Sequence, residues 1–172
     1  MSGVSIKNLA SFNATVQSWF SAVEKASKDA AVGIAHEAFE QILETAPQGS
    51  GDFVANTNVS VSHPNYEFFE NAAGARNSAQ AGKGDEHAMN VARSKVDWGS
   101  ISDTLILGKP VFIASKAKHD QYYSGLIEEG KIKLRPINAG ADHIYRRAKN
   151  YVMNRYAKID KSNLPLLRGK AK

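Results

Sequence analysis

The 172-residue chain contains no cysteine. This absence excludes disulfide bonds, thiolate metal ligands and cysteine nucleophiles, and it favours a reducing compartment such as the cytoplasm. The sequence also lacks an apolar run near the roughly 20 residues that a membrane-spanning helix needs. Its first ten residues, MSGVSIKNLA, are too polar for the apolar core of a signal peptide. We therefore expect a soluble protein that folds in the cytoplasm.

The composition is that of one ordinary folded domain, but the charge is unevenly distributed. Hydrophobic residues make up 42% of the chain and charged residues 23%. Residues 1–108 carry 7 basic and 12 acidic side chains, a net charge of −5, whereas residues 109–172 carry 15 and 5, a net charge of +10. Such asymmetry is typical of a nucleic-acid surface, or of head-to-tail assembly in which an acidic face meets a basic one.

Apolar residues recur every three or four positions in the first part of the chain, as they do on one face of an amphipathic helix. This pattern predicts a helix from Ser11 to Thr45, with a kink or a close packing contact at Gly33, because glycine weakens a helix interior. Ala46-Pro47 ends the helix, since a residue before proline avoids helical angles. The apolar positions are Phe12, Val16, Trp19, Val23, Ala26, Ala30, Ile34, Phe39, Ile42 and Leu43.

Short β-branched and apolar segments after this helix predict a small sheet. Residues 53–62 alternate as a half-solvated strand does. Residues 103–107 and 111–114 are apolar runs separated by Gly108-Lys109-Pro110, an order typical of a hairpin. We therefore expect three strands, of which the last two pair with each other.

The remaining segments predict two further helices and a loop. A helix from Asp85 to Val96 would have Asp85 as its N-cap and Trp98 as an anchor against the core. The stretch 71–84 is small and polar and predicts a surface loop. A last helix begins near Arg135-Pro136 and ends near Tyr156.

Together these elements predict an α+β fold, with a long N-terminal helix and a C-terminal helix packed on a small, mostly antiparallel sheet. Residues 1–157 would form this single domain, with an inserted loop at about 64–100. Residues 158–172 would form a basic C-terminal tail that carries an apolar group, Leu164, Leu166 and Leu167.

No residue pattern in the chain predicts a catalytic centre, a metal site or a cofactor site. Glu128 and Glu129 are adjacent carboxylates, and in an extended segment their side chains would point to opposite faces. We expect one of them to be buried or paired and the other to be solvated. A pocket that joined Glu128 to His119 or His143 would argue against this reading. We therefore expect a protein that is not an enzyme and has no cofactor.

Three short motifs follow one another in a fixed order along the chain. Each combines a turn residue with a residue suited to a subunit contact, because glycine permits sharp turns and a tyrosine ring or a fixed charge suits an interface. They are Ala46-Pro47-Gln48-Gly49-Ser50-Gly51-Asp52-Phe53, Tyr123-Ser124-Gly125-Leu126-Ile127-Glu128-Glu129-Gly130, and Leu134-Arg135-Pro136-Ile137.

In this order the motifs resemble those of the tail-completion or neck family of long-tailed bacteriophages. That family commonly has a helix ending in an A-P-x-x-T-G-x-L-like turn, a strand, a hairpin leading to Y-A-x-x-x-E-x-G, and an R-P motif before the last helix. In this chain Ser50, Phe53 and Ser124 replace the threonine, the leucine and the alanine. The resemblance spans roughly residues 20–155.

The resemblance implies a non-enzymatic virion protein, assembled in the host cytoplasm, that forms a ring at the junction of head and tail. The ring would be a hexamer. Its partners would be the tail tube, a tail terminator and a head-completion or connector ring, with DNA passing through the lumen without sequence-specific binding, and no membrane is involved. The turn and motif residues would be Pro47, Gly49, Gly51, Gly130 and Pro136, and the candidate subunit-interface residues are Tyr122, Tyr123, Glu128, Leu164, Leu166 and Leu167.

Two other functions fit the same sequence. A tail terminator, which caps the tail tube rather than joining it to the head, shares the expected features. A small basic nucleic-acid-binding protein would explain the charge of residues 109–172 and the last helix, which mixes Arg146, Arg147 and Lys149 with tyrosines. Its affinity would fall as salt rises.

Overall fold

The computed structural model describes residues 9–47, 51–74, 85–115, 128–131 and 143–156, with the side chains of α1 described from residue 13. The elements, in chain order, are helices and strands of an α+β fold, as the sequence predicts. They are α1 (Leu9–Thr45), α2 (Asp52–Ala55), β1 (Asn58–Val61), α3 (Glu86–Lys95), α4 (Trp98–Thr104), β2 (Val111–Ala114) and α6 (Ile144–Tyr156).

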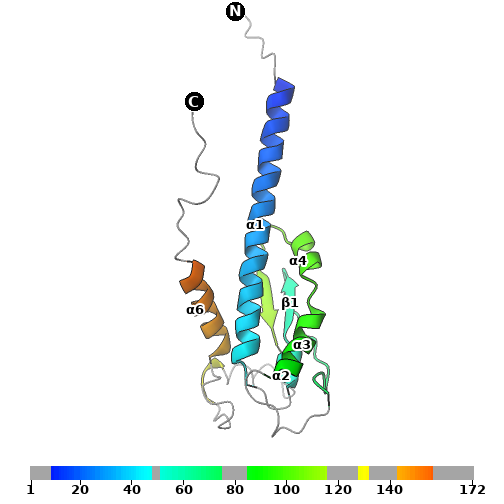
Figure 1. Cartoon of the computed structure of the whole chain (residues 1–172), viewed down its shortest axis with the longest axis vertical. Helices are drawn as coiled ribbons and strands as arrows, with labels where there is room; N and C mark the ends of the chain where they lie inside the picture. The colour runs from blue at the N-terminus through cyan, green and yellow to red at the C-terminus, as the bar shows by residue number, and fades with distance from the viewer. Residues whose placement is uncertain (1–8, 48–50, 75–84, 116–127, 132–142, 157–172) are drawn as a thin grey trace, which may run out of the picture.

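Helix α1 is the axis of the molecule (Figure 1). Helix α6 lies along one side of the C-terminal half of α1, and the two-stranded sheet, α3 and α4 lie on the other side. The N-terminal part of α1 extends beyond the other described elements. None of the helices in the described part of the chain combines the length and hydropathy needed to cross a bilayer.

The core forms around the C-terminal half of α1. Phe39 and Leu43 are fully buried there, against Val54 of α2 and Ile144 of α6. The ring of Trp98 packs edge-on against Phe39, with 5.7 Å between ring centroids. Trp98 contacts the core as predicted, but it anchors a separate helix, α4, rather than the helix before it. Burial of aliphatic and aromatic side chains from several helices therefore holds this end of the molecule together.

The predicted helix that follows the loop is confirmed, and so is its cap. The Asp85 carboxylate accepts hydrogen bonds from the backbone N–H groups of His87 and Ala88, at the N-terminus of α3. Helix α1 runs through Gly33, but a Cβ added there would meet no atom within 4 Å, so the predicted close contact at Gly33 is wrong.

The predicted strand 53–62 is wrong in its first part. Residues 52–55 form the short helix α2, which follows the left-handed residue Gly51, at φ 87°. Phe53 and Val54 are residue types that favour strands, but here both lie in a helix and are buried in the core. The strand β1 begins only at Asn58.

The predicted hairpin is also wrong. Asp103 and Thr104 belong to α4, which begins after Asp97 and is capped by that side chain through the N–H of Ser100. The turn at Gly108 exists, at φ 85°, but it connects the end of α4 to β2. Strand β2 pairs antiparallel with β1, Asn58 opposite Ala114 and Val61 opposite Val111. The partner of β2 is thus a distant segment rather than the preceding one.

Candidate functional site

The predicted site residues divide into those that the structure describes and those that it does not. Pro47, Gly51, Glu128 and Gly130 are described. The following lie outside the described residues: Gly49, Tyr122, Tyr123, Pro136, Leu164, Leu166 and Leu167. Of the predicted loop 71–84, only residues 71–74 are described, and Ala73 among them is buried in the core.

The first motif forms a tight joint between α1 and α2. Gly51 is buried at a positive φ, and a Cβ added to it would lie 2.9 Å from the Cβ of Ala73 and 3.1 Å from that of Ala88. Only glycine fits both the left-handed angle and this close approach without strain. The motif residue Gly51 therefore serves the packing of the core.

A buried amide extends this joint to the segment after β1. The Asn56 side chain donates to the carbonyl oxygens of Asp52 and Phe69, at 2.8 and 2.9 Å, and accepts the N–H of Phe69 at 2.8 Å. All of these partners are backbone groups, so the buried Asn56 side chain satisfies its own polar atoms and ties the segment at Phe69 to α2. No sequence pattern singled out this residue.

Glu128, from the second motif, caps α6. Its carboxylate accepts hydrogen bonds from the backbone N–H groups of Tyr145 and Arg146, each at 2.9 Å. A negative charge at a helix N-terminus is stabilised by the free N–H groups and by the helix dipole. Nδ1 of His143 contacts the backbone carbonyl oxygen of Glu128. The neighbouring Glu129 is exposed and forms a surface ion pair with Lys131.

Tyr145, which follows this cap, ties α6 to the sheet. Its hydroxyl oxygen accepts the N–H of Ser115, at the end of β2, with 3.3 Å between the atoms. Burial raises the pKa of the Tyr145 hydroxyl above its ordinary value of 10.0, and the hydrogen bonds with Ser115 oppose that rise. Glu128 and Tyr145 thus link three segments that are far apart in the sequence.

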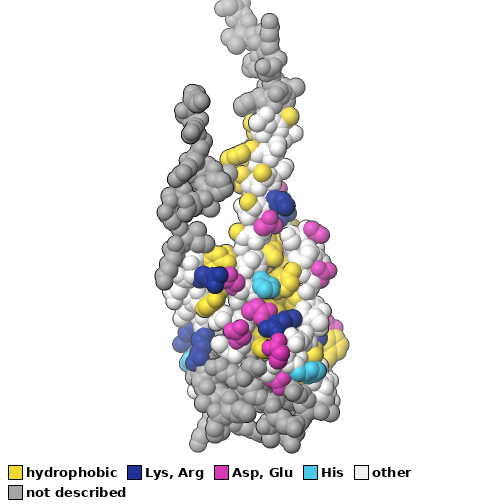
Figure 2. All heavy atoms as spheres, in the orientation of Figure 1, with side chains coloured by type: hydrophobic (Ala, Val, Ile, Leu, Met, Phe, Trp, Pro, Cys, Tyr) yellow, Lys and Arg dark blue, Asp and Glu magenta, His cyan; other side chains and the backbone are white. Residues whose placement is uncertain are grey.

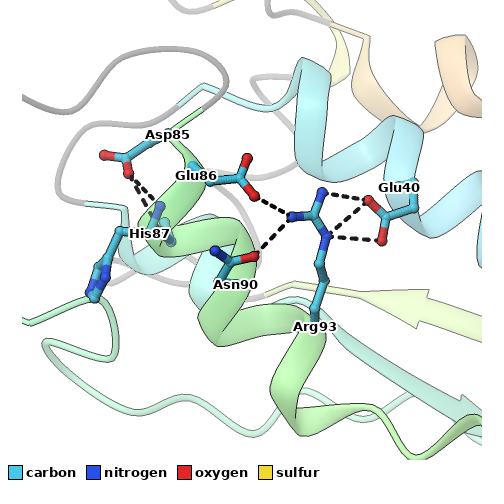
Figure 3. Close-up of polar contacts among 7 residues, drawn as sticks. Glu40, Asp85, Glu86, His87, Asn90 and Arg93 are labelled. Carbon is cyan, nitrogen blue, oxygen red and sulfur yellow. Dashed lines mark hydrogen bonds and ion pairs between the residues drawn. The ribbon is translucent and has the colours of Figure 1, made fainter.

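A charged cluster joins α3 to α1 on the face shown in Figure 3. Arg93 points from α3 towards Glu40 of α1 and donates from Nε at 3.0 and 3.1 Å and from Nη2 at 2.7 Å. Its Nη1 donates to Glu86 and Asn90. The hydrogen bond with Glu40 is the main cause that raises the pKa of Arg93. Each of the three guanidinium nitrogens donates to a neighbouring side chain, which is typical of a structural cluster.

An open hollow of about 570 Å³ lies between α1 and α4. Its walls include His36, whose ring packs edge-on against Trp98 with 4.9 Å between centroids. Within the described ranges, no three His, Cys, Asp or Glu side chains are placed to share a metal ion. The walls also include Asp29 and Glu37, and Glu37 pairs with Arg155 of α6 at 3.1 Å.

An exposed apolar surface lies on the N-terminal part of α1. We call residues 13–30 of α1 the arm, and most of it extends beyond the other described elements (Figure 1). Trp19 is 52% exposed and Phe20 is 60% exposed, and their rings pack edge-on at 5.2 Å. Figure 2 shows hydrophobic side chains along this projecting part. Two large aromatic residues on an isolated helix are typical of a surface that another molecule covers.

The apolar spacing of α1 shifts after Ala30, but the shift alone did not indicate that the arm is exposed. The arm residues follow steps of three and four as far as Ala30, and the buried positions start again at Ala35, five residues later. A step of five moves the apolar face to another side of the helix.

Helix α6 carries a basic outer surface. Arg146, Arg147 and Lys149 are exposed on it. Arg155, at its C-terminal end, forms an ion pair with Glu37 of α1 at 3.1 Å and donates to the hydroxyl oxygen of Tyr151. One of the basic side chains predicted on this helix, Arg155, thus pairs with an acidic residue of the same chain.

Comparison of the chain with known family models, with curated proteins and with solved structures finds no match.

Proposed function

We propose that this protein is a non-enzymatic assembly subunit that forms a ring at the neck of a long-tailed bacteriophage, as a tail-completion protein. The proposal rests on the arm, because its adjacent exposed aromatic residues, Trp19 and Phe20, are typical of a surface that another molecule covers. The order of the three motifs supports the phage assignment. The ring would lie between the tail tube and a head-completion or connector ring, in the virion.

The described motif residues act within the subunit in this proposal. Gly51 allows α1 to turn into α2, and Glu128 holds the N-terminus of α6. Both fix the angles at which helices leave the core. A ring subunit needs such fixed angles, since a small error in each copy prevents closure of the ring.

The nucleic-acid-binding alternative is favoured by a different observation, the exposed Arg146, Arg147 and Lys149 on α6. Clustered cations on one helix bind phosphate groups through counterion release, which makes the affinity strongly dependent on salt. In the ring proposal the same surface would face the DNA that passes through the lumen and would take no part in joining heads to tails. A main function in DNA binding requires tight binding by the protein outside any particle.

The first test is the location and joining activity of the chain. Heads and tails assembled without this protein should remain separate, and adding the purified protein should join them, as counted by electron microscopy. Labelled protein should appear at the junction in every joined particle. Label on free tails that already end at normal length would instead indicate a tail terminator. Normal joining without the protein would contradict the proposal.

A second measurement separates the DNA-binding alternative. Binding of the purified protein to duplex DNA is measured between 50 and 200 mM salt, where about six phosphate contacts would lower the affinity roughly 10³-fold. The proposal expects weak binding at 200 mM salt and an unchanged joining activity when Arg146 and Lys149 are replaced by Gln together. Loss of all function in that variant, together with tight binding by the wild type, would favour the alternative.

A further inference from the structure

The arm has the residue spacing of a coiled-coil helix. Val16, Trp19, Val23, Ala26 and Ala30 follow one another in steps of three, four, three and four. A repeat of 3.5 residues places all of them on one seam, and an identical seam on another helix packs against it as knobs into holes. None of these five side chains is fully buried in the chain.

This seam points away from the core of its own chain. At about 100° per residue, its mean direction lies roughly 160° around the helix from that of the buried positions on the C-terminal half of α1. Those buried positions are Ala35, Phe39, Ile42, Leu43 and Ala46. Helix α6 packs on the same side of α1 as the seam, because Glu37, which pairs with Arg155 of α6 at 3.1 Å, points within about 20° of the seam's mean direction. This contact lies seven residues beyond Ala30, the last seam residue, so α6 as described leaves most of the seam uncovered.

The charges of the arm lie on the opposite side from the seam. Its charged residues form two pairs one helical turn apart, Lys28 with Glu24 at 3.0 Å and Lys25 with Asp29 at 3.9 Å. Residues 13–23 carry no charge at all. Two copies of the seam can therefore approach without repulsion between like charges. An acidic or basic partner would find no complementary charge on the seam.

We propose that the arm packs against the arm of a second copy of this chain, seam to seam and parallel, and that this contact joins the subunits in pairs within the ring. The inference deepens the proposed function and its parallel orientation rests on it, because copies in a closed ring point the same way along the ring axis. Phe20, next to the seam, adds apolar area at its edge. The contact would be a left-handed helical pair.

The test compares two substitutions that introduce the same charge into the same helix. Ala26→Asp places a carboxylate in the seam, and Ser21→Asp places one on the opposite side. Both positions are exposed within the chain, so neither change removes core packing. The molar mass of the full-length protein is measured by sedimentation equilibrium over a range of concentrations, and circular dichroism checks that both variants keep their helix content.

We expect the wild type and Ser21→Asp to associate equally, and Ala26→Asp to raise the dissociation constant at least 100-fold, because a carboxylate buried in an apolar seam loses its hydration. Equal masses for the two variants would contradict the inference. So would a wild type that is monomeric at all concentrations, as expected if another protein or the chain's own C-terminal residues cover the seam.

The absence of cysteine allows a second test of which molecule covers the seam. With Ala26→Cys, oxidation should give a covalent dimer, since equivalent seam positions of parallel helices lie close together. Ser21→Cys should give little dimer. Equal cross-linking of both would contradict the parallel contact.

The two proposals can fail separately. If Ala26→Asp leaves the mass unchanged and heads and tails still join, the seam contact is wrong and the proposed function stands. If the seam contact is confirmed but the protein is absent from joined particles, the proposed function is wrong.

Discussion

The two halves of α1 have similar spacing of apolar residues but different environments. In the C-terminal half, Phe39 is fully buried and helices α2 and α6 pack around it. In the arm, Phe20 is 60% exposed on a helix that projects beyond the other described elements. Both halves have an apolar residue every three or four positions. Amphipathic spacing therefore predicts that a helix packs against something, but it does not say whether that partner is its own core or another molecule.

The comparison also separates two kinds of stabilisation. The C-terminal half is held by burial and by contacts with specific polar groups, such as the Arg93–Glu40 pair. The arm is held as a helix by its own backbone and by two surface ion pairs, which contribute little. Isolated helices of this length are marginal in water, so a partner would also stabilise the helix itself. We expect the following substitutions to test this division, beginning with the largest effect.

The largest difference in the free energy of unfolding should come from replacing a phenylalanine by alanine at two places on α1. Phe39→Ala should lower the free energy of unfolding by about 3–5 kcal/mol, because it leaves a cavity in a packed core. Phe20→Ala should change it by less than about 0.5 kcal/mol when measured on dilute protein, since its side chain is mostly exposed. Urea unfolding followed by circular dichroism measures both. Similar losses for the two variants would show that the arm is packed within its own chain.

The second effect concerns the joint between α1 and α2. Gly51→Ala should lower the free energy of unfolding by about 2–4 kcal/mol, from the left-handed angle and from overpacking against Ala73 and Ala88. Gly108→Ala is the matched control, because Gly108 also has a positive φ but an added Cβ there meets no atom within 4 Å. It should cost only about 1 kcal/mol. Thermal unfolding measures the stability of both variants. Equal losses of stability would show that close packing at Gly51 contributes nothing.

The third effect concerns the hydrogen bond between Tyr145 and Ser115, which links α6 to the sheet, and it depends on pH. Tyr145→Phe leaves the N–H of Ser115 without its acceptor and should cost about 1–3 kcal/mol at pH 7. The pKa of Tyr145 is raised in the folded state, so above pH 10 the unfolded chain loses this proton more readily than the folded one. The wild type should therefore lose stability as pH rises above 10.

The Phe variant should show a smaller alkaline loss, because it has no proton to release at this position. Urea unfolding at pH 7, 10 and 11 measures how the free energy of unfolding of each protein changes with pH. An identical alkaline slope in the two proteins would contradict the burial of the Tyr145 hydroxyl.

The smallest effect tests the cap of α6. Glu128→Gln keeps the size of the side chain but removes the charge that interacts with the helix N-terminus, and should cost about 0.5–2 kcal/mol. Glu129→Gln removes an equal charge from an exposed neighbour and should change the stability by less than about 0.5 kcal/mol. Differential scanning calorimetry compares them. If only the joining of heads and tails changed in Glu128→Gln, this residue would act at the subunit interface instead.

Much of the local structure could be predicted from the sequence. The long N-terminal helix, the Asp85 cap and the contact of Trp98 with the core all follow from spacing and from side-chain chemistry within a few residues. The errors came where a short segment is held by distant contacts. Phe53 and Val54 look like strand residues, but Gly51 and the surrounding core hold them in a helical turn. Four residues are too few for periodicity to distinguish the two.

In the candidate site, too, local features could be predicted from the sequence and long-range contacts could not. The motif that contains Glu128 was visible in the sequence, but its partners, the N–H groups of Tyr145 and Arg146, lie 17 and 18 residues away. The arm was visible as a helix, but its exposure was not, because exposure depends on which other elements pack beside it.

The sequence by itself determined the α+β class and the extent of α1, because helix formation follows from spacing and propensity over a few turns. Only the tertiary structure decided that β2 pairs with β1, that Glu128 caps α6, and that the apolar seam of the arm points away from the core. These features depend on contacts between residues far apart in the chain, whose relative positions are set by the packing of the whole core rather than by any local pattern.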